Sequence, residues 1–211
     1  MSDTLNKMCE ALIKGRAPEV KSLMEQAINE GLDPATILNE GLVKGMGEIG
    51  ERFKKNQVYV PEVLIASRAM KAGMDLLRPK LVSAGVKPRG VAVIGTVKGD
   101  LHDIGKNLVG MMLEGAGFQV VDGGVDVSPE KFLELAKANN ANIIGVSALL
   151  TTTMTNMKLV VEAVEASALK GKCKVIIGGA PVTQAFADEI KAAGYSADAA
   201  SAADLAKTLC A

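Results

Sequence analysis

The first 78 residues have the hydrophobic spacing of amphipathic helices. Apolar side chains recur every three or four positions, which places them on one face of an α-helix. The apolar face of the second segment consists of Val20, Leu23, Met24, Ala27 and Ile28. Gly31 ends that segment, and Asp33 followed by Pro34 resembles an N-cap with a first-turn proline. We expect four helices joined by short turns and packed as a bundle, the last ending near Pro79.

The pattern changes after residue 89. Short, continuous apolar runs alternate with amphipathic segments, which is typical of a parallel sheet covered by helices on both faces. The expected strands are 90–97, 119–124, 142–149, 174–179 and a weaker run at 195–197. The helices expected after them are 104–117, 129–139, 152–168, 181–193 and 202–209.

The predicted fold class is therefore α/β. It has an N-terminal four-helix bundle at 1–78, a linker at 79–89, and a doubly wound, five-stranded parallel sheet of Rossmann-like type at 90–211. Sheets of this kind bind ligands outside the carboxyl ends of their strands. The loops after the strands are therefore where binding or catalytic residues should lie.

The third predicted helix is unusually rich in glycine. It contains Gly41, Gly45, Gly47 and Gly50. Each glycine inside a helix costs about 1 kcal/mol relative to alanine. Either two helices pack closely here, or something bulky lies against this face.

Composition and charge exclude several classes of partner. Lys+Arg and Asp+Glu both number 24, so the basic surplus that nucleic acid or an anionic membrane attracts is missing. No apolar run approaches the roughly 20 residues that span a bilayer, and the N-terminus does not resemble a signal peptide. Three widely separated cysteines form neither a disulfide framework nor a metal motif. We expect a cytoplasmic protein that binds neither nucleic acid nor membrane.

The loop after the first strand carries the only histidine of the chain, His102. Asp100 lies two residues earlier, where a carboxylate can accept the second ring N–H of a metal-binding histidine. Gly99 and Gly105 bracket the pair and allow the backbone to approach a large ligand. The alternatives are a surface or structural histidine, and an Asp103 that caps the next helix.

A lone histidine without a cysteine or carboxylate cluster cannot hold zinc, which needs three or four protein ligands. It can hold one axial position of a metal whose other ligands come from a macrocycle. The sequence therefore points to a haem-like or corrin-like cofactor.

Two further loops have small or hydroxyl-bearing residues at the same edge. One is 145–153, GVSALLTTT, and the other is Gly178-Gly179-Ala180. They could hold an inserted ligand, or they could be a helix cap and a tight turn. Neither is a phosphate-binding motif of the GxxxxGK[ST] or GxGxxG type.

The segment GDLHDIG at 99–105 resembles the Asp-x-His-x-x-Gly motif of base-off, His-on corrinoid proteins. The spacing to Ser147-Ala148-Leu149 and to Gly178-Gly179 fits the same family, and the helical half resembles its methyl-cap domain. Over its whole length the chain is similar to corrinoid proteins of methylotrophic methyltransferase systems that act on methylamines or methanol. It also resembles the cobalamin-binding module of cobalamin-dependent methionine synthase.

The resemblance implies a cobamide cofactor whose cobalt takes His102 as its lower axial ligand. Asp100 would hydrogen-bond His102, with Thr153 behind it, and both would tune the ligand. In methionine synthase the third position is a serine, so Thr153 keeps the hydroxyl. The other implied cofactor-binding residues are Glu40, Phe53, Val60, Gly99, Leu101, Asp103, Ile104, Gly105, Ser147, Leu149, Thr151, Gly178, Gly179 and Ala200.

The implied function is that of a methyl carrier rather than a complete enzyme. A substrate-specific methyltransferase would load cobalt(I), and a second methyltransferase would unload methyl-cobalt(III) to a thiol or pterin. A reductive-activation protein would be a further partner. The alternatives are a corrinoid-dependent regulator, a mutase-type cobalamin domain and a flavodoxin-like signalling domain.

Overall fold

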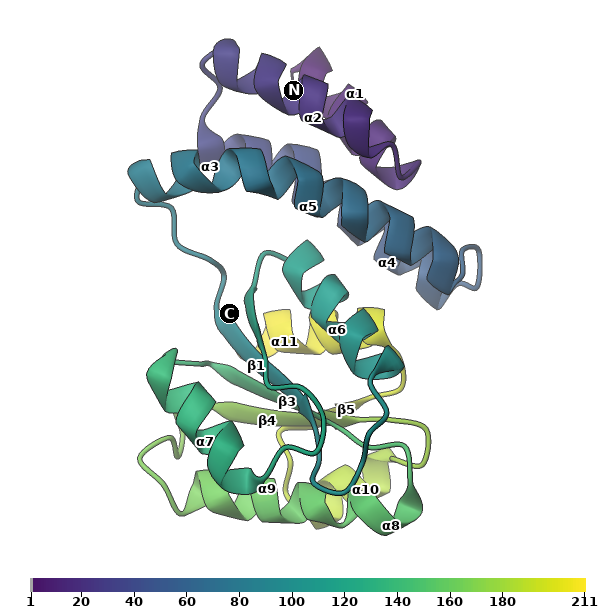
Figure 1. The fold of residues 1–211 in the computed structure, drawn as a ribbon, viewed down its shortest axis with the longest axis vertical. Coiled ribbons are helices and arrows are strands. Elements are labelled where there is room, and N and C mark those ends of the chain that lie inside the picture. Colours follow the sequence, from purple (N-terminus) through teal and green to yellow (C-terminus); the bar gives the residue numbers. More distant parts are fainter. Residues whose placement is uncertain (1) are drawn as a thin grey trace. The chain divides into compact units, whose positions relative to one another are not determined.

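The computed structural model describes residues 2–211 and divides the chain into two units (Figure 1). The helical unit comprises residues 2–88 with Gly115–Gly117, and the α/β unit comprises 89–114 with 118–211. None of the helices in residues 2–211 is long and apolar enough to cross a membrane.

The helical unit is built from α1 (Asp3–Ile13), α2 (Ala17–Asn29), a third continuous segment, and α5 (Val60–Ser83). The third segment consists of α3 (Pro34–Thr36), η1 (Ile37–Val43) and α4 (Lys44–Lys54). The buried core is aliphatic and rich in methionine: Leu5, Met8, Leu12, Val20, Met24, Ile37, Leu42, Met46, Ile49, Val63, Met70 and Leu77. Because the expected apolar faces are buried, the four helical segments form as the periodicity predicts.

The third segment begins as predicted but contains an unpredicted π-helical stretch, η1. Asp33 is its N-cap, and the Asp33 carboxylate accepts hydrogen bonds from Thr36 N–H and Oγ1, both at 2.9 Å. The backbone N–H of Lys44 donates to the carbonyl of Asn39, five residues earlier, which widens the helix by one residue. Residue periodicity cannot distinguish one such widened turn from ordinary α-helix.

Close packing explains two of the four glycines. A Cβ on Gly41 would lie 2.8 Å from Met8 Sδ, and a Cβ on Gly45 would lie 3.0 Å from Leu12 Cδ2. Both neighbours belong to α1, so these glycines let two helices approach each other. A Cβ on Gly47 would meet nothing within 4 Å.

Helix α5 is longer than predicted. It continues through Pro79 to Ser83, so the first five residues of the expected linker 79–89 are helical. A proline inside a helix costs about 3 kcal/mol, which is why the sequence suggested a stop. Burial of Leu81, one turn after Leu77, favours continuation, and Ser83 Oγ donates to the Pro79 carbonyl at 2.9 Å.

The α/β unit confirms the predicted five-stranded, all-parallel sheet among the described residues. Its strands are β1 (Val91–Thr96), β2 (Gln119–Asp122), β3 (Ile143–Ser147), β4 (Lys174–Gly178) and β5 (Gly194–Ser196). They lie in the order β2-β1-β3-β4-β5. At the carboxyl edge the register aligns Thr96 with Ser147, Ser147 with Gly178, and Gly178 with Ser196. Residues from the three predicted loops therefore meet in one row.

Helices cover both faces of this sheet (Figure 1). One face carries α6 (Ile104–Gly115) and α11 (Ala199–Leu209), and the other carries α7 (Pro129–Ala138), α8 (Thr151–Met154), α9 (Asn156–Glu165) and α10 (Gln184–Glu189). The second face buries a continuous core that includes Val93, Ile144, Val175, Ile177, Phe132, Ala136, Met157, Val160 and Val164. The expected single helix 152–168 is instead two helices, and α11 begins three residues early because Asp198 caps it by accepting from Ser201 N–H at 2.9 Å.

Candidate functional site

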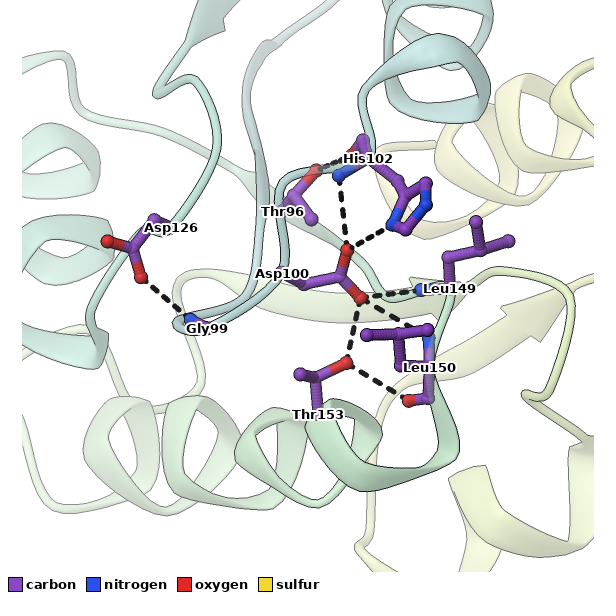
Figure 2. Close-up of polar contacts among 8 residues, drawn as sticks. All are labelled: Thr96, Gly99, Asp100, His102, Asp126, Leu149, Leu150 and Thr153. Atoms are coloured by element: carbon purple, nitrogen blue, oxygen red, sulfur yellow. Dashed lines mark hydrogen bonds and ion pairs between the residues drawn. The ribbon is translucent and has the colours of Figure 1, made fainter.

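The site lies at the carboxyl ends of β1 and β3. Because β2 lies on one side of β1 and β3 on the other, the chain changes winding direction at this pair of strands. Ligands of open α/β sheets bind at such a switch point. Figure 2 shows the side chains that meet there: Asp100 and His102 follow β1, and Leu149, Leu150 and Thr153 follow β3.

Asp100 joins the two loops. It is 0% exposed, and its two carboxylate oxygens have different partners. Oδ1 lies 2.9 Å from His102 Nδ1 and accepts from His102 N–H at 3.1 Å. Oδ2 accepts from Leu149 N–H at 2.8 Å, from Leu150 N–H at 3.3 Å and from Thr153 Oγ1 at 2.7 Å (Figure 2). The carboxylate therefore fixes the His102 loop against the loop after β3.

These contacts determine the charge of Asp100. Burial raises the pKa of Asp100, because the anion loses its hydration. The hydrogen bonds from Leu149 N–H, Thr153 and His102 outweigh that cost, so the pKa of Asp100 lies well below its ordinary value of 3.8. Asp100 is thus an anion at neutral pH and can only accept hydrogen bonds.

The charge of Asp100 in turn determines which nitrogen of His102 is available. Since Oδ1 is an acceptor, the proton of the neutral imidazole resides on Nδ1, and Nε2 presents a lone pair. The His102 side chain is 53% exposed although its partner Asp100 is buried. The imidazole is therefore fixed through Nδ1, while the rest of the ring is exposed, as an axial metal ligand requires.

Thr96, Asn156 and Asp126 belong to the site although the sequence motifs do not point to them. The buried Thr96 Oγ1 donates to the His102 carbonyl at 2.7 Å. Asn156 Nδ2 donates to the Lys98 carbonyl at 2.8 Å, and Asp126 Oδ1 accepts from Gly99 N–H at 2.7 Å. All three fix the backbone around His102. In the sequence, Thr96 and Asp126 are marked only by their position at or soon after the end of a strand, and Asn156, at the start of α9, has no such signal.

The remaining predicted residues of the first loop surround His102. Leu101 and Ile104 are 73% and 76% exposed, and Leu149 from the second loop is also exposed. Such apolar exposure is characteristic of a binding surface. Asp103 accepts from the Asn107 side chain at 3.0 Å. Gly105 is exposed, and Gly99 has a φ of +82°, which favours glycine.

The predicted residues of the later loops lie along the same edge. Ser147 ends β3, Gly178 ends β4, and Thr151 is exposed at the start of α8. A Cβ on Gly179 would lie 1.8 Å from the Ala148 carbonyl oxygen, so glycine is required here for backbone packing alone. Ala200 is buried in the first turn of α11.

Glu40, Phe53 and Val60 lie in the helical unit. Glu40 is in η1, Phe53 is in the last turn of α4, and Val60 begins α5. All three side chains are half-buried. Their contact with a cofactor stays a prediction.

The donor set fits a macrocyclic metal centre. Residues 2–211 contain no group of three or more His, Cys, Asp or Glu side chains that could hold a metal ion. A single oriented nitrogen, with the exposed apolar side chains Leu101, Ile104 and Leu149 on the same two loops, suits a metal that brings its own equatorial ligands and an apolar ring. Fold and site are thus those of an α/β cofactor-binding protein with one exposed, oriented histidine at the carboxyl edge of its sheet.

Comparison with known proteins identifies that class more closely. Residues 90–204 match the B12 binding domain family, and residues 4–78 match a second family with the same description. The chain belongs to the corrinoid proteins of methylamine and methanol methyltransferase systems, and its cofactor is a corrinoid.

Three relatives illustrate the match. The chain is 43% identical to the dimethylamine corrinoid protein of Methanosarcina barkeri over 98% of this chain and 97% of that protein. It is 39% identical to a corrinoid protein of Desulfitobacterium hafniense strain Y51, over 97% and 96%. The crystal structure of the methanol:cobalamin methyltransferase complex MtaBC from Methanosarcina barkeri contains a chain that matches with a TM-score of 0.88 and 28% identity, covering 99% of this chain and 80% of that one.

Proposed function

We propose that this chain is a methyl carrier that binds its corrinoid in the base-off, His-on state, with His102 Nε2 as the lower axial ligand of cobalt. When bound, the corrinoid supplies the transfer chemistry by carrying the methyl group on its metal. The chain supplies the ligand, its orientation and its charge. One observation carries the proposal: a half-exposed imidazole whose Nδ1 is anchored 2.9 Å from a buried aspartate.

Asp100 and Thr153 would tune this ligand. The Asp100 anion favours the Nδ1–H tautomer and increases the basicity of Nε2. The Thr153 hydroxyl, at 2.7 Å from Asp100 Oδ2, withdraws part of that negative charge. The pair acts through His102, so their roles are those of positioning residues.

The rest of the predicted set would hold the body of the cofactor. Leu101, Ile104 and Leu149 offer apolar surface beside His102. Ser147, Thr151 and the glycines at 178 and 179 would border the displaced nucleotide tail, with Ala200 near its end. Phe53 and Val60 of the helical unit would cover the upper face of the corrin ring, and Glu40 would reach the cofactor from the same unit.

The partners would be two methyltransferases and a reductive-activation protein. The first methyltransferase would transfer a methyl group from a methylated amine, methanol or a related donor, and the second would pass it to a thiol or pterin. The names of the dimethylamine corrinoid relatives support a methylamine as the first donor to test. The three free cysteines favour action in the reducing cytoplasm.

The test is a comparison of nitrogen ligation in the wild type and in His102→Ala. Both proteins are loaded with cobinamide, a corrinoid that lacks the benzimidazole nitrogen, then desalted and reduced to the cobalt(II) form. We expect the electron paramagnetic resonance spectrum of the wild type to show splitting by one axial nitrogen, and His102→Ala to lose it and to retain less corrinoid. Free imidazole added to His102→Ala should restore the splitting. Splitting that survives in His102→Ala without imidazole would contradict the assignment.

A further inference from the structure

The loop after β2 runs beside the segment that leads to His102. Gly123 N–H donates to the Ile94 carbonyl at 2.8 Å, and Thr96 exchanges backbone hydrogen bonds with this loop, accepting from Val127 N–H at 2.9 Å and donating to the Gly124 carbonyl at 3.0 Å. These bonds extend the pairing with β1 beyond Asp122, the last residue of β2. The loop is therefore a rigid support rather than a free connection.

Within this loop, Asp126 contacts the residues nearest to His102, namely Gly99 and Asp100. Its carboxylate Oδ1 accepts from Gly99 N–H at 2.7 Å (Figure 2), and its own N–H donates to the Asp100 carbonyl at 3.1 Å. Asp126 thus bonds two consecutive residues, Gly99 through its side chain and Asp100 through its main chain. Asp100 N–H in turn donates to the Val97 carbonyl at 3.1 Å, so the backbone of Asp100 is bonded on both sides.

The backbone of Asp126 is specialised for this double contact. Its φ is +54°, in the left-handed region that non-glycine residues other than asparagine and aspartate rarely adopt. The side chain is exposed, and no core packing requires it. An exposed side chain in a strained conformation that bonds the loop of the ligand is expected to serve that loop.

Resting on the proposed function, we propose that Asp126 is a positioning residue for the cobalt ligand. By holding the Gly99–Asp100 backbone, it fixes the direction of the Asp100 carboxylate. That carboxylate orients the His102 ring and accepts from Leu149 N–H. Loss of the Asp126 carboxylate should therefore loosen both sides of the network without touching His102.

Three variants separate the carboxylate from the backbone conformation. Asp126→Asn keeps an acceptor oxygen and tolerates a positive φ. Asp126→Gly keeps the backbone conformation but has no acceptor, and Asp126→Ala loses both. Asn140→Gly is a matched control, because Asn140 also has a positive φ of +50° but lies before β3, at the other end of the strands.

Two readouts test the proposal in the whole chain. In the apo-protein, the amide hydrogen of Leu149 should exchange roughly fivefold faster in Asp126→Gly than in the wild type, the factor expected for loss of one net hydrogen bond. In the protein loaded with cobinamide, which has no benzimidazole nitrogen, and then reduced, the ratio of nitrogen-ligated to unligated cobalt should fall by a similar factor. Asp126→Asn should match the wild type in both readouts.

The outcomes distinguish this proposal from the function on which it rests. If wild-type cobalt shows no nitrogen splitting, the proposed function fails while the exchange measurement still tests the support of Asp100. If Asp126→Gly keeps wild-type exchange at Leu149 and wild-type nitrogen ligation, Asp126 is not a positioning residue. A loss in Asn140→Gly equal to that in Asp126→Gly would also overturn the proposal, because general destabilisation would then explain both.

Discussion

The helical unit pairs its charges at the surface, whereas the α/β unit buries charges at one edge of its sheet. In the helical unit, ion pairs such as Lys14–Glu10 and Arg52–Glu48 join exposed side chains one helical turn apart. In the α/β unit, Asp100 is 0% exposed and Lys106 is 4% exposed. Both lie in or directly after the loop that carries His102.

The difference indicates which unit must hold side chains in a fixed orientation. An exposed ion pair on a helix contributes about 0.5 kcal/mol or less, and its loss moves nothing else. A buried charge costs several kcal/mol unless hydrogen bonds compensate it, so it is retained where orientation matters. The five hydrogen-bonding groups around the Asp100 carboxylate provide that compensation.

The helical unit instead depends on apolar contacts. Its core contains the flexible methionines Met8, Met24, Met46 and Met70. Methionine side chains fill irregular gaps and specify a single geometry less strictly than branched residues. The helical unit therefore depends on adaptable apolar packing, whereas the α/β unit orients groups through buried hydrogen bonds.

The largest predicted effect comes from the buried ion pair of the α/β unit. Lys106 Nζ lies 2.6 Å and 2.5 Å from the two oxygens of Asp122, whose side chain is 49% exposed. Asp122→Ala should lower the free energy of unfolding by about 3 kcal/mol, because it leaves the Lys106 ammonium buried with mainly Asn107 Oδ1 as a partner. Urea unfolding measures this cost.

A surface pair of the helical unit is the control for that measurement. Glu48→Ala removes the partner of Arg52 and should cost about 0.5 kcal/mol or less. Lys106→Met should cost less than Asp122→Ala, since Asp122 can be hydrated. If Asp122→Ala and Glu48→Ala lower the free energy of unfolding equally, the two units do not differ in the strength of their ion pairs.

An intermediate effect is expected at the glycines of the third helical segment. Gly47→Ala meets no neighbour and should raise the free energy of unfolding of the apo-protein by about 1 kcal/mol through helix propensity. Gly45→Ala should give no such gain, because its Cβ would lie 3.0 Å from Leu12 Cδ2 and 3.3 Å from the Cys9 carbonyl oxygen. Thermal unfolding of both variants checks the difference.

The same pair of variants tests whether the glycine face also receives the corrin. Gly47→Ala should then stabilise the apo-protein yet retain less hydroxocobalamin after desalting. If Gly47→Ala retains as much hydroxocobalamin as the wild type, the glycines of this segment serve folding alone.

Much of the α/β unit was predictable because its signals are local. Runs such as Val91–Thr96 and Ile143–Ser147 are short and apolar up to their last residue, which is typical of strands buried on both faces. Asp100 and His102 were predictable because their spacing of two residues is local as well. The contact between Asp100 and Thr153 spans 53 residues, and only the family resemblance indicated it.

The unpredicted features depend on contacts between distant segments. Asp126 bonds Gly99 across 27 residues, and Lys106 pairs with Asp122 because β2 lies beside β1. The helix through Pro79 reflects burial of Leu81, which propensity does not include. No periodicity in the sequence carries this information.

The smallest predicted effect concerns the exposed N-cap Asp33. Hydrogen bonds from Thr36, first from its backbone N–H and then from its hydroxyl, hold the pKa of Asp33 below its ordinary value of 3.8. Asp33→Asn keeps a capping oxygen but has no charge, so the wild type should be slightly more stable at neutral pH. Because the folded pKa is the lower one, this advantage is complete above the unfolded value and is lost as the pH falls through the folded pKa.

Unfolding of wild type and Asp33→Asn between pH 7 and pH 2, at low and at about 1 M salt, measures this advantage. Salt should remove most of it, because the Asp33 carboxylate faces water and the Debye length falls to about 3 Å at 1 M. The buried network around Asp100 should be much less sensitive to salt, since no ions reach it. An Asp33 advantage that persists in salt or at low pH would mean that the two units do not differ in how they use charge.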